Sequence, residues 1–510
     1  MGSNQLFINV SPQVGIQRDG TDFDCTMYTE GSWVRFYKDR AKKIGGYQVL
    51  HPGTQEIVRE MYSTNTAGAI ILYLGRASSL TYLQVSLEGT TTSPIDRTPI
   101  GFTYDVNNQW SITTVCLLNG LTTYIVATAA PNSLDIGNTA RFPVYVGTLT
   151  GTAPLTPLTN GGDPILTAGG VMTILNFTVI YDIDSFILIN NGEDFDSWEA
   201  QKPISSSKFV YGDAVRSGNE SAGLLWSLDN VVKLTYTGLS ADNFPMFEQS
   251  YVSTQSTILS AKCVVNYEPF FFWIGDDCFY IYNGTVSELP NTTNKDWFFN
   301  NLNRDYKERV SAFINRRFGE IWWLFPKGES TENNHALVYV VASQTWYDTD
   351  QIDRAYGLAS SSQFKYPILS SSAPEFYGES FLYPIWMHER GLNKISFGRV
   401  EAITSSFTTN INNMWLENPK ATVINVDKII PDIQQSGDIL FQVNAKSYPN
   451  DSYSQSNLIT LSEGTLFKDV RFKGSFFSFT FISNVIDGDY LMGKTMVLLD
   501  ITDDQRPGKA

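Results

Sequence analysis

Short apolar runs, many of them alternating with polar residues, recur along the whole chain between clusters of Gly, Asn, Asp and Ser. This pattern is typical of β-strands separated by turns, and helical spacing is hard to find anywhere. Turn residues at Leu228-Asp229-Asn230 and Gly275-Asp276-Asp277 stand between two apolar arms and predict hairpins. The clearest runs lie at 69–75, 122–129, 186–192, 224–238, 270–284, 320–328 and 335–341. We therefore expect an all-β protein.

The spacing of these runs predicts how the strands are arranged. One residue in each unit marks an inner strand: Leu72, Tyr124, Ile187, Trp226, Trp273, Trp322 and Ile368. Successive markers are 52, 63, 39, 47, 49 and 46 residues apart, and four of these intervals fall near the roughly 40 to 50 residues of a β-propeller blade. The spacing favours a degenerate propeller of about six to seven blades. Because the units diverge in sequence, a stack of unrelated hairpins in a large sandwich is the alternative.

After about residue 400 the pattern changes to longer alternating strands. In the run 469–483 the side chains of Phe472, Phe477, Phe479 and Phe481 are predicted to share one face of a half-buried strand, and a second strand follows at 490–501. The expected organisation is therefore an N-terminal segment with a basic hairpin (1–50), a propeller-like domain (51–400) and a C-terminal β-sandwich or platform (401–510).

Composition agrees with a large repetitive domain plus a small one. The chain has 510 residues, beyond the roughly 250 to 300 at which a single core stops growing. The start of the chain lacks the pattern of a secretory signal, and no run nears the roughly 18 apolar residues of a membrane helix. Four cysteines, Cys25, Cys116, Cys263 and Cys278, lack metal-ligand spacing. We expect free thiols in a soluble protein made in a reducing cytoplasm, without membrane insertion.

The sequence lacks the residue patterns that enzymes need. Its three histidines, His51, His335 and His388, are widely separated and stand in no metal or catalytic motif. Glycine-rich phosphate loops and a nucleophile elbow are absent, and the acidic pairs lie in turn-like contexts. We therefore expect no catalytic residues, no cofactor and no metal, and a protein that is not an enzyme.

Basic residues are outnumbered but locally clustered. The net charge is −16, with 36 basic residues facing 52 acidic ones, which disfavours ordinary nucleic-acid binding. One cluster lies in the stretch 31–48 and consists of Arg35, Lys38, Arg40, Lys42 and Lys43; the other consists of Arg304, Lys307, Arg309, Arg316 and Arg317. Such clusters could touch DNA, but they are more often solvated faces or contacts to an acidic neighbouring subunit.

The order of these features resembles a known family. RDGT (18–21) is followed by GSWVRFYKDRAKKIGGY (31–47), by propeller strands that contain SAFINRRFGEIWWLFP (311–326), and by a terminal sheet with VRFKGSFFSFTF (470–481). The chain is similar to the tail hub or nozzle proteins of short-tailed phages, also called packaged-DNA stabilisation proteins. The signatures match at Trp33, Arg35, Phe36, Lys43, Ile44, Gly45, Gly46 and Tyr47, and at Asn315, Arg316, Arg317, Glu320, Trp322 and Trp323.

The resemblance implies a structural part of the virion tail that is assembled in the host cytoplasm. It implies a ring of identical subunits, sixfold in the family, below the portal and its adaptor. Such a ring closes the channel on packaged DNA, conducts double-stranded DNA at ejection without sequence-specific binding, and contacts other tail or fibre proteins. An acidic conduit fits this role, because it repels phosphate.

For the hairpin, the sequence predicts a strand, a turn at Lys38-Asp39-Arg40, and a second strand ending at Gly45-Gly46, where glycine allows unusual backbone angles. Its cations are expected to meet an acidic surface of the next subunit or of the adaptor, or else to be solvated without a partner.

Two other functions stay open at this point. One is a carbohydrate-binding propeller, a receptor-binding or depolymerising tail component. Its sugar-stacking residues would be Trp273, Trp297, Trp322, Trp323 and Trp346, although their regular spacing favours core packing. The other is a cellular propeller scaffold.

Overall fold

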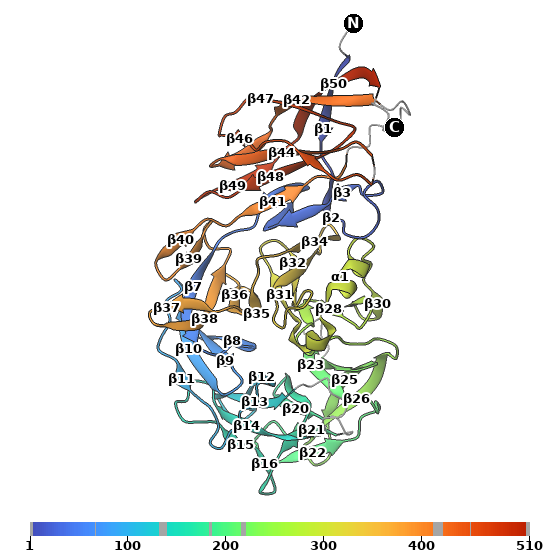
Figure 1. Ribbon diagram of the computed structural model, residues 1–510. Coiled ribbons are helices and arrows are strands. Elements are labelled where there is room, and N and C mark those ends of the chain that lie inside the picture. The colour runs from blue at the N-terminus through green and yellow to red at the C-terminus, as the bar shows by residue number, and fades with distance from the viewer. Residues whose placement is uncertain are drawn as a thin grey trace.

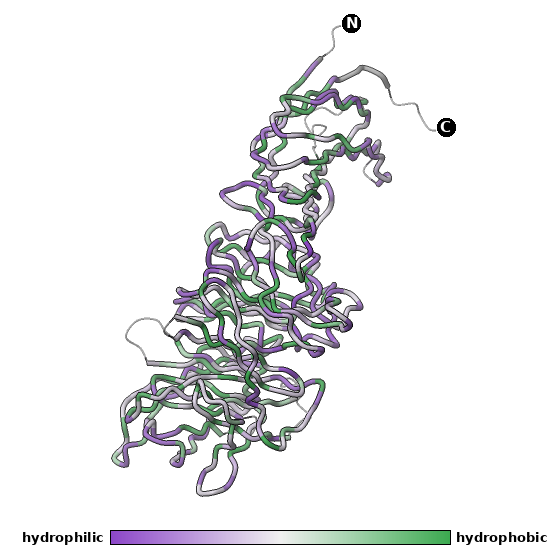
Figure 2. Tube along the Cα trace, turned by 90° about the vertical axis from the view of Figure 1, so that its left-hand side faces the viewer, coloured by the Kyte–Doolittle hydropathy of each residue, from purple (hydrophilic) through white to green (hydrophobic). Residues whose placement is uncertain are grey.

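The computed structural model describes residues 4–66, 68–131, 140–182, 186–215, 221–411, 422–448 and 450–505. Seven sheets follow one another along the chain and form the blades of a propeller (Figure 1); six are antiparallel, and the seventh also contains one parallel pair of strands. A second unit, the terminal unit, is built from strands near both ends of the chain and lies at the narrow end of the molecule (Figure 2). The predicted fold class is confirmed: the protein is an all-β propeller with additional C-terminal sheets.

Each of the first six blades is a sheet of at least four strands in chain order, beginning with the strand nearest the propeller axis. Blades 1 to 3 consist of β8 (Glu60–Thr66), β9 (Ala69–Gly75), β10 (Leu80–Ser86) and β11 (Ile95–Asp96); β12 (Asn108–Cys116), β13 (Thr123–Pro131), β14 (Phe142–Thr148) and β15 (Thr156–Pro157), with β18 (Leu166–Thr167) also paired to β14; and β19 (Gly170–Ile174), β20 (Phe177–Tyr181), β21 (Ile187–Asn190) and β22 (Trp198–Gln201). A two-stranded sheet of β16 (Thr159–Asn160) and β17 (Asp163–Pro164) projects from blade 2.

Blades 4 to 6 repeat the same arrangement. They consist of β23 (Phe209–Val215), β24 (Ala222–Ser227), β25 (Val231–Leu239) and β26 (Pro245–Ser253); β27 (Val265–Tyr267), β28 (Phe270–Ile274), β29 (Phe279–Tyr282) and β30 (Val286–Glu288); and β31 (Ser311–Asn315), β32 (Glu320–Phe325), β33 (His335–Val340) and β34 (Thr345–Thr349). A short helix, α1 (Lys295–Asn301), and a 3₁₀ segment, η1 (Arg304–Arg309), connect blade 5 to blade 6. The hairpins predicted around Asp229 and Asp276 are confirmed as β24–β25 and β28–β29.

The seventh blade closes the ring with a strand from the start of the chain. Its first strands are β35 (Arg354–Leu358), β36 (Ile368–Ser371) and β38 (Ser380–His388), with β37 (Glu375–Tyr377) paired to β38. The next strand is β7 (Tyr47–Thr54), which pairs antiparallel with β38, and β39 (Lys394–Ser396) and β40 (Arg399–Glu401) extend the sheet beyond it. Residues that precede blade 1 in sequence therefore complete blade 7.

The sequence markers lie one strand further out than expected. Leu72, Trp226 and Trp322, for example, lie on the second strand of their blades, and Ile187 lies on the third. The second strands are covered on both faces and therefore read as continuous apolar runs, whereas the inner strands face a polar cavity. If Val179 of β20 is taken as the marker of blade 3 in place of Ile187, the two irregular intervals become 55 (from Tyr124) and 47 (to Trp226) residues, which are less unequal than 63 and 39.

The terminal unit is a sandwich with an attached third sheet. Its strands are β1 (Asn4–Val10), β4 (Glu30–Ser32), β5 (Val34–Tyr37), β6 (Arg40–Lys43), β41 (Ser405–Thr408), β42 (Thr422–Ile430), β43 (Ile433–Ser436), β44 (Ile439–Lys446), β45 (Ser454–Gln455), β46 (Ile459–Leu461), β47 (Lys468–Gly474), β48 (Phe476–Ser483), β49 (Asp489–Met492) and β50 (Thr495–Gln505). The sheets have the orders β1-β50-β42-β47, β4-β41-β48-β44-β45 and β43-β49-β6-β5, with β46 also paired to β44. Phe479, Phe481 and Val426 belong to the core of this unit.

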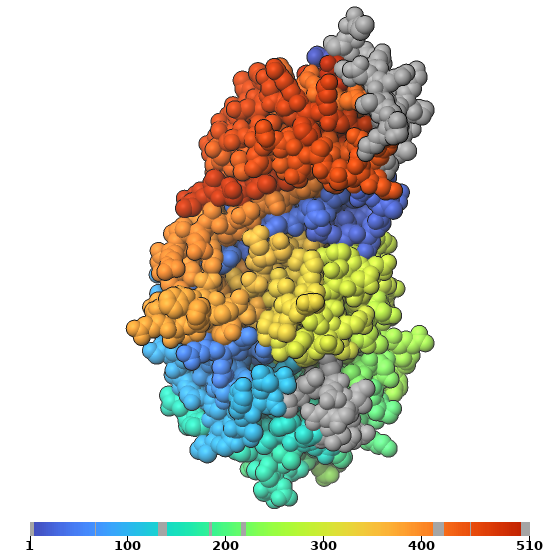
Figure 3. Space-filling model, viewed as in Figure 1, coloured from blue at the N-terminus to red at the C-terminus, as the bar shows by residue number. Residues whose placement is uncertain are grey.

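Two expectations about the chain ends need correction. The single strand expected at 469–483 is two strands, because β47 and β48 belong to different sheets and the chain changes sheet at Ser475. Residues 1–50 do not form a separate segment either: β1 pairs with β50, β4 with β41 and β6 with β49, while β7 completes the propeller. The early strands satisfy their backbone groups at sheet edges provided by much later ones. Between the two units, N-terminal residues form the blue band beside yellow blade 6 in Figure 3.

Candidate functional site

Three of the motifs that carry the family resemblance meet at blade 6. Arg18 of the first motif, Arg35 of the second, and Asn315 with Glu320 of the third all contribute to buried ion pairs or to the hydrogen bonds around them. We call this region the joint, and define it by Arg18, Arg35, Asn315, Glu320, Asp348 and Glu389. It connects the terminal unit, which contains β5, to blades 6 and 7.

Arg35 is the centre of the joint. Its side chain is 1% exposed, and its Nε lies 3.0 Å from Oε1 of Glu320. Nη1 donates to Oε2 of Glu389 at 3.1 Å, and Nη2 contacts the other oxygen of the same carboxylate. Trp322 Nε1 donates to Glu320 Oε2 at 3.0 Å, and the Tyr347 hydroxyl donates to Oε1 at 2.9 Å. Every carboxylate oxygen around Arg35 therefore has a donor.

The electrostatics of this cluster hold the charges together. Burial alone would lower the pKa of Arg35, but the carboxylates of Glu320 and Glu389 raise it above its usual value. Burial raises the pKa of Glu320, and Arg35 opposes that shift. Asn315 donates to Glu320 at 3.3 Å and to Glu389 at 3.1 Å, which offsets the repulsion between the two carboxylates.

The glycines after the hairpin serve close packing and not unusual backbone angles. Neither Gly45 nor Gly46 has a positive φ. A Cβ on Gly46 would stand 2.4 Å from the carbonyl oxygen and 2.5 Å from the nitrogen of Asn393, and a Cβ on Gly45 would meet the side chain of Glu389. The sequence-based reason for Gly45-Gly46 was therefore wrong: the glycines let the chain pass directly against the 389–393 segment. The predicted hairpin is confirmed, but its turn consists of Lys38 and Asp39, because Arg40 already pairs with Tyr37 in the second strand, which ends at Lys43.

The first motif holds the N-terminal segment against the same blade. Arg18 donates to both oxygens of Asp348 on β34, at 2.9 and 3.0 Å, and His335 Nε2 lies 2.9 Å from Oδ2 of Asp348. Asp19 accepts from the backbone nitrogens of Asp296 and Trp297 at 3.0 and 2.8 Å. It thereby caps the first turn of α1 from a distant part of the chain.

The Arg18–Asp348 pair predicts a specific acid sensitivity. Burial alone would raise the pKa of Asp348, but Arg18 and the hydrogen bond from His335 lower it to about 2. A lowered carboxyl pKa adds stability that is complete above about pH 4 and is lost as the pH falls toward 2, here about 2 kcal/mol. As the pH is lowered from 5 to 2, the thermal unfolding temperature should therefore fall less steeply for Asp348→Asn than for the native protein. Parallel curves would contradict this assignment.

The hairpin cations divide into an inner and an outer set. Arg35 and Lys43 are buried within this chain, and Lys42 lies 3.5 Å from Asp489. Burial lowers the pKa of Lys43 to about 8. The expectation that all five cations face a partner is therefore wrong for Arg35 and Lys43, whereas Lys38 and Arg40 are exposed.

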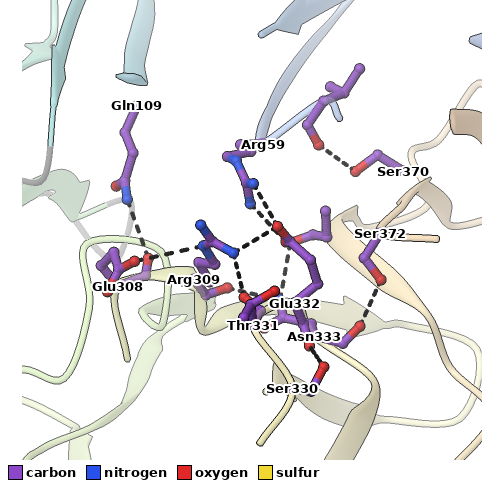
Figure 4. Close-up of polar contacts among 12 residues, drawn as sticks. Arg59, Gln109, Glu308, Arg309, Ser330, Thr331, Glu332, Asn333, Ser370 and Ser372 are labelled. Carbon is purple, nitrogen blue, oxygen red and sulfur yellow. Dashed lines mark hydrogen bonds and ion pairs between the residues drawn. The ribbon is translucent and has the colours of Figure 1, made fainter. Parts of the chain in front are cut away.

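Strand β31 divides the second basic cluster into two groups. Arg304, Lys307 and Arg309 precede it, whereas Arg316 and Arg317 follow it. Lys307 donates to Asp276 at 3.1 Å. Arg309 donates to Oε1 of Glu332 at 2.7 Å, and Arg59 binds both oxygens of that carboxylate (Figure 4). The first three cations therefore tie blades together and do not form a free patch with the last two.

A cavity of about 840 Å³ lies on the propeller axis, lined by residues of the inner strands. The Lys262 ammonium contacts the Glu60 carboxylate and donates to the carbonyl of Trp110 at 2.6 Å, and the Tyr356 hydroxyl donates to Glu60 at 3.1 Å. Burial lowers the pKa of Lys262 to about 7. These side chains connect blades 1, 2 and 7 with the segment before blade 5. The volume of the axial cavity is that of a small-molecule site, typically about 300 to 1,000 Å³, and leaves no room for a DNA duplex.

The tryptophans considered for sugar stacking are mostly core residues. Trp273, Trp322, Trp323 and Trp346 are at most 3% exposed. Trp297, on α1, is half-buried beneath the cations of Arg18 and Lys327. Packing between blades therefore accounts for their spacing.

Sequence reasoning missed two residues of the joint and one that packs against it. Glu389 supplies the second carboxylate for Arg35, Asp348 receives Arg18, and Phe318 lies with its ring centroid 3.6 Å from the Arg35 guanidinium. Glu389 and Asp348 have no local signal, because their partners lie hundreds of residues away. Phe318 stands within the third motif, next to the matched Arg317, and could have been noted.

Comparison with known proteins adds little to this picture. No family model matches the chain, and no curated protein matches it. Solved structures with some similarity are Chaetomium thermophilum Raptor (8% identity, TM-score 0.40, 69% of this chain and 30% of that chain) and a mitotic checkpoint complex structure (11% identity, TM-score 0.39, 67% and 93%). A third is the exo-β-1,3-galactanase of Phanerochaete chrysosporium with galactose (10% identity, TM-score 0.28, 86% and 95%). This chain thus spans less than a third of the Raptor chain.

The described residues contain neither a metal-binding cluster nor a membrane-spanning helix. No group of three or more His, Cys, Asp or Glu side chains there could hold a metal ion. No helix in that part of the chain has the length and apolarity to cross a membrane.

Proposed function

We propose that this protein is a subunit of the tail hub or nozzle of a short-tailed phage, a structural ring that lies below the portal and adaptor. It would close the channel on packaged DNA, conduct the DNA at ejection, and catalyse no reaction. The observation that carries the proposal is the joint, where the separate motifs of the family resemblance converge.

Convergence matters because short scattered motifs often match by chance. Arg35 and Glu320 are 285 residues apart in sequence, yet they form a buried ion pair. Arg18 and Asp348 are 330 residues apart and form another at the same blade. Motifs that jointly build one buried structure are better explained by a shared fold than by coincidence, since each residue depends on the others for its partner.

The small size of the axial cavity excludes a DNA channel through the propeller of a single subunit. DNA cannot pass through the propeller of one subunit, so the channel of the proposed ring lies between subunits, around the ring axis. The surplus of 52 acidic over 36 basic residues would keep this channel from holding DNA, because an acidic surface repels phosphate.

The proposed partners follow from this role. Copies of this chain form the ring, six in number by the resemblance, and the adaptor below the portal receives it. Other tail or fibre proteins contact its outside. The proposed location is the virion tail, after assembly in the host cytoplasm.

The mass of the purified protein tests the proposal. Light scattering should give a ring near six copies of 57.1 kDa, about 343 kDa, either for the protein alone or after mixing with portal and adaptor rings. An unrelated ring of similar size serves as the control for unspecific association. A 57.1 kDa monomer that ignores both partner rings would contradict the proposed function.

A further inference from the structure

We infer that Lys38, Arg40, Arg316 and Arg317 form one basic face that binds an acidic surface of a second copy of this chain. The inference rests on the proposed ring, because it names a surface by which neighbouring subunits would meet. It joins the outer half of the hairpin cluster to the last two residues of the second cluster.

A row of aromatic rings brings these four residues together. The rings of Tyr37 and Phe318 are 5.6 Å apart, edge to face. The Lys38 ammonium lies 5.3 Å from the Tyr37 ring, and the Arg317 guanidinium lies 5.2 Å from the Phe318 ring. Arg40 is the cross-strand partner of Tyr37, and Arg316 precedes Arg317. The hairpin tip and the turn between β31 and β32 are therefore one continuous surface.

The four cations are exposed and have no ion pair among the described residues. The nearby acids have partners: Glu320 and Glu389 bind Arg35, and Asp489 pairs with Lys42. Asp39 at the hairpin tip is the acidic residue in the sequence of the face itself. The basic face thus keeps an excess of positive charge.

Charge complementarity identifies the partner. The chain carries a net charge of −16, with 52 acidic residues against 36 basic ones, so the chain outside the basic face has an excess of acidic residues. Two copies would repel each other through most orientations, and an orientation that places the basic face against the acidic remainder is favoured instead. Such pairing also joins two different surfaces, which is the geometry that a closed ring needs.

The support beneath the cations is rigid. Lys38 and Asp39 have φ angles of 51° and 59°, as a two-residue hairpin turn requires. Phe318 is fixed by the Arg35 guanidinium over its ring. A preorganised surface loses less entropy on binding than mobile side chains do, and arginine is enriched at protein interfaces.

Charge reversal tests the inference. The variant Lys38→Glu with Arg317→Glu should weaken self-association by about tenfold or more, since it replaces attraction by repulsion. The matched control, Lys202→Glu with Lys365→Glu, changes the net charge equally at exposed sites outside the basic face and should assemble as the native protein does. Light scattering over a concentration series, at ionic strengths of about 0.05 M and about 0.5 M, gives the comparison. All four substitutions are at exposed positions, so thermal unfolding should stay unchanged.

Cross-linking provides a second readout. Native protein mixed from ¹⁴N-labelled and ¹⁵N-labelled copies is treated with a carbodiimide, which joins lysines to carboxylates in direct contact. We expect a mixed-isotope peptide that joins Lys38 to an acidic residue of the other copy.

The outcomes separate this inference from the proposed function. Rings that form equally well in the native protein and in the reversal variant, without mixed-isotope Lys38 cross-links, overturn the basic face and leave the ring proposal standing. Binding of a short DNA duplex that the reversal variant loses overturns the choice of a protein partner. A monomer that ignores the portal and adaptor rings removes the proposed function and this inference with it.

Discussion

Replacing Arg35 with methionine is expected to destabilise the protein by about 3 to 5 kcal/mol at pH 7, because the substitution leaves two buried carboxylates without their cation. The Arg35 side chain is 1% exposed, and those of Glu320 and Glu389 are 1% and 8% exposed. Unfolding by urea, followed by intrinsic tryptophan fluorescence, measures the loss. Arg40→Met, at an exposed position of the same hairpin, is the matched control and should change stability by less than about 0.5 kcal/mol.

The loss of stability caused by Arg35→Met should become smaller as the pH is lowered. Burial already raises the pKa of Glu320, and removal of the neighbouring guanidinium raises it further. A raised carboxyl pKa means that protonation favours the folded state, so the variant should recover stability relative to the native protein as the pH falls from 7 to 5. An equal deficit at both pH values would show that lost packing, and not unpaired charge, is responsible.

Gly46→Ala is expected to cost about 3 kcal/mol, the upper end of the usual range for added volume in a packed region. The new Cβ would meet backbone atoms of Asn393 and Leu392, which cannot rotate away as a side chain can. Equilibrium urea unfolding is the measurement. Gly120→Ala is the matched control, because Gly120 also has an ordinary φ and its nearest atoms lie 3.8 and 4.0 Å from the new Cβ. Equal costs for the two variants would contradict the close-packing role of Gly46.

The strands and the propeller could be predicted from sequence because each depends on local pattern. β24 and β32 are buried on every residue and are mostly apolar, with Ser227 and Glu320 at one end each. The inner strands were harder to find: β12 has the sequence NQWSITTVC and lines a polar cavity, so its hydrophobic signal is weak. For this reason the markers fell on second strands, and on the third strand at Ile187.

The joint could be predicted only in part. The motifs pointed to Arg35, Gly46 and Glu320, but the sequence did not reveal that Arg35 is buried, because a count of charges contains no information about pairing across 285 residues. Lys38-Asp39 was recognised as a turn from local chemistry alone. The basic face escaped notice because it combines halves of two clusters that the sequence separates by more than 270 residues.

The closing strand β7 has a consequence for how the protein is made. Its partner β38 begins at Ser380, more than 320 residues after β7 ends at Thr54. At about 5 to 20 residues per second, a ribosome needs roughly 15 to 65 s to synthesise that interval. During this time the nascent chain holds an unpaired strand and an open series of blades, so its longest-range pairings form late and the topology predicts slow completion of folding. The terminal unit can be completed only after this, because β1 pairs with β50, the last strand to be synthesised.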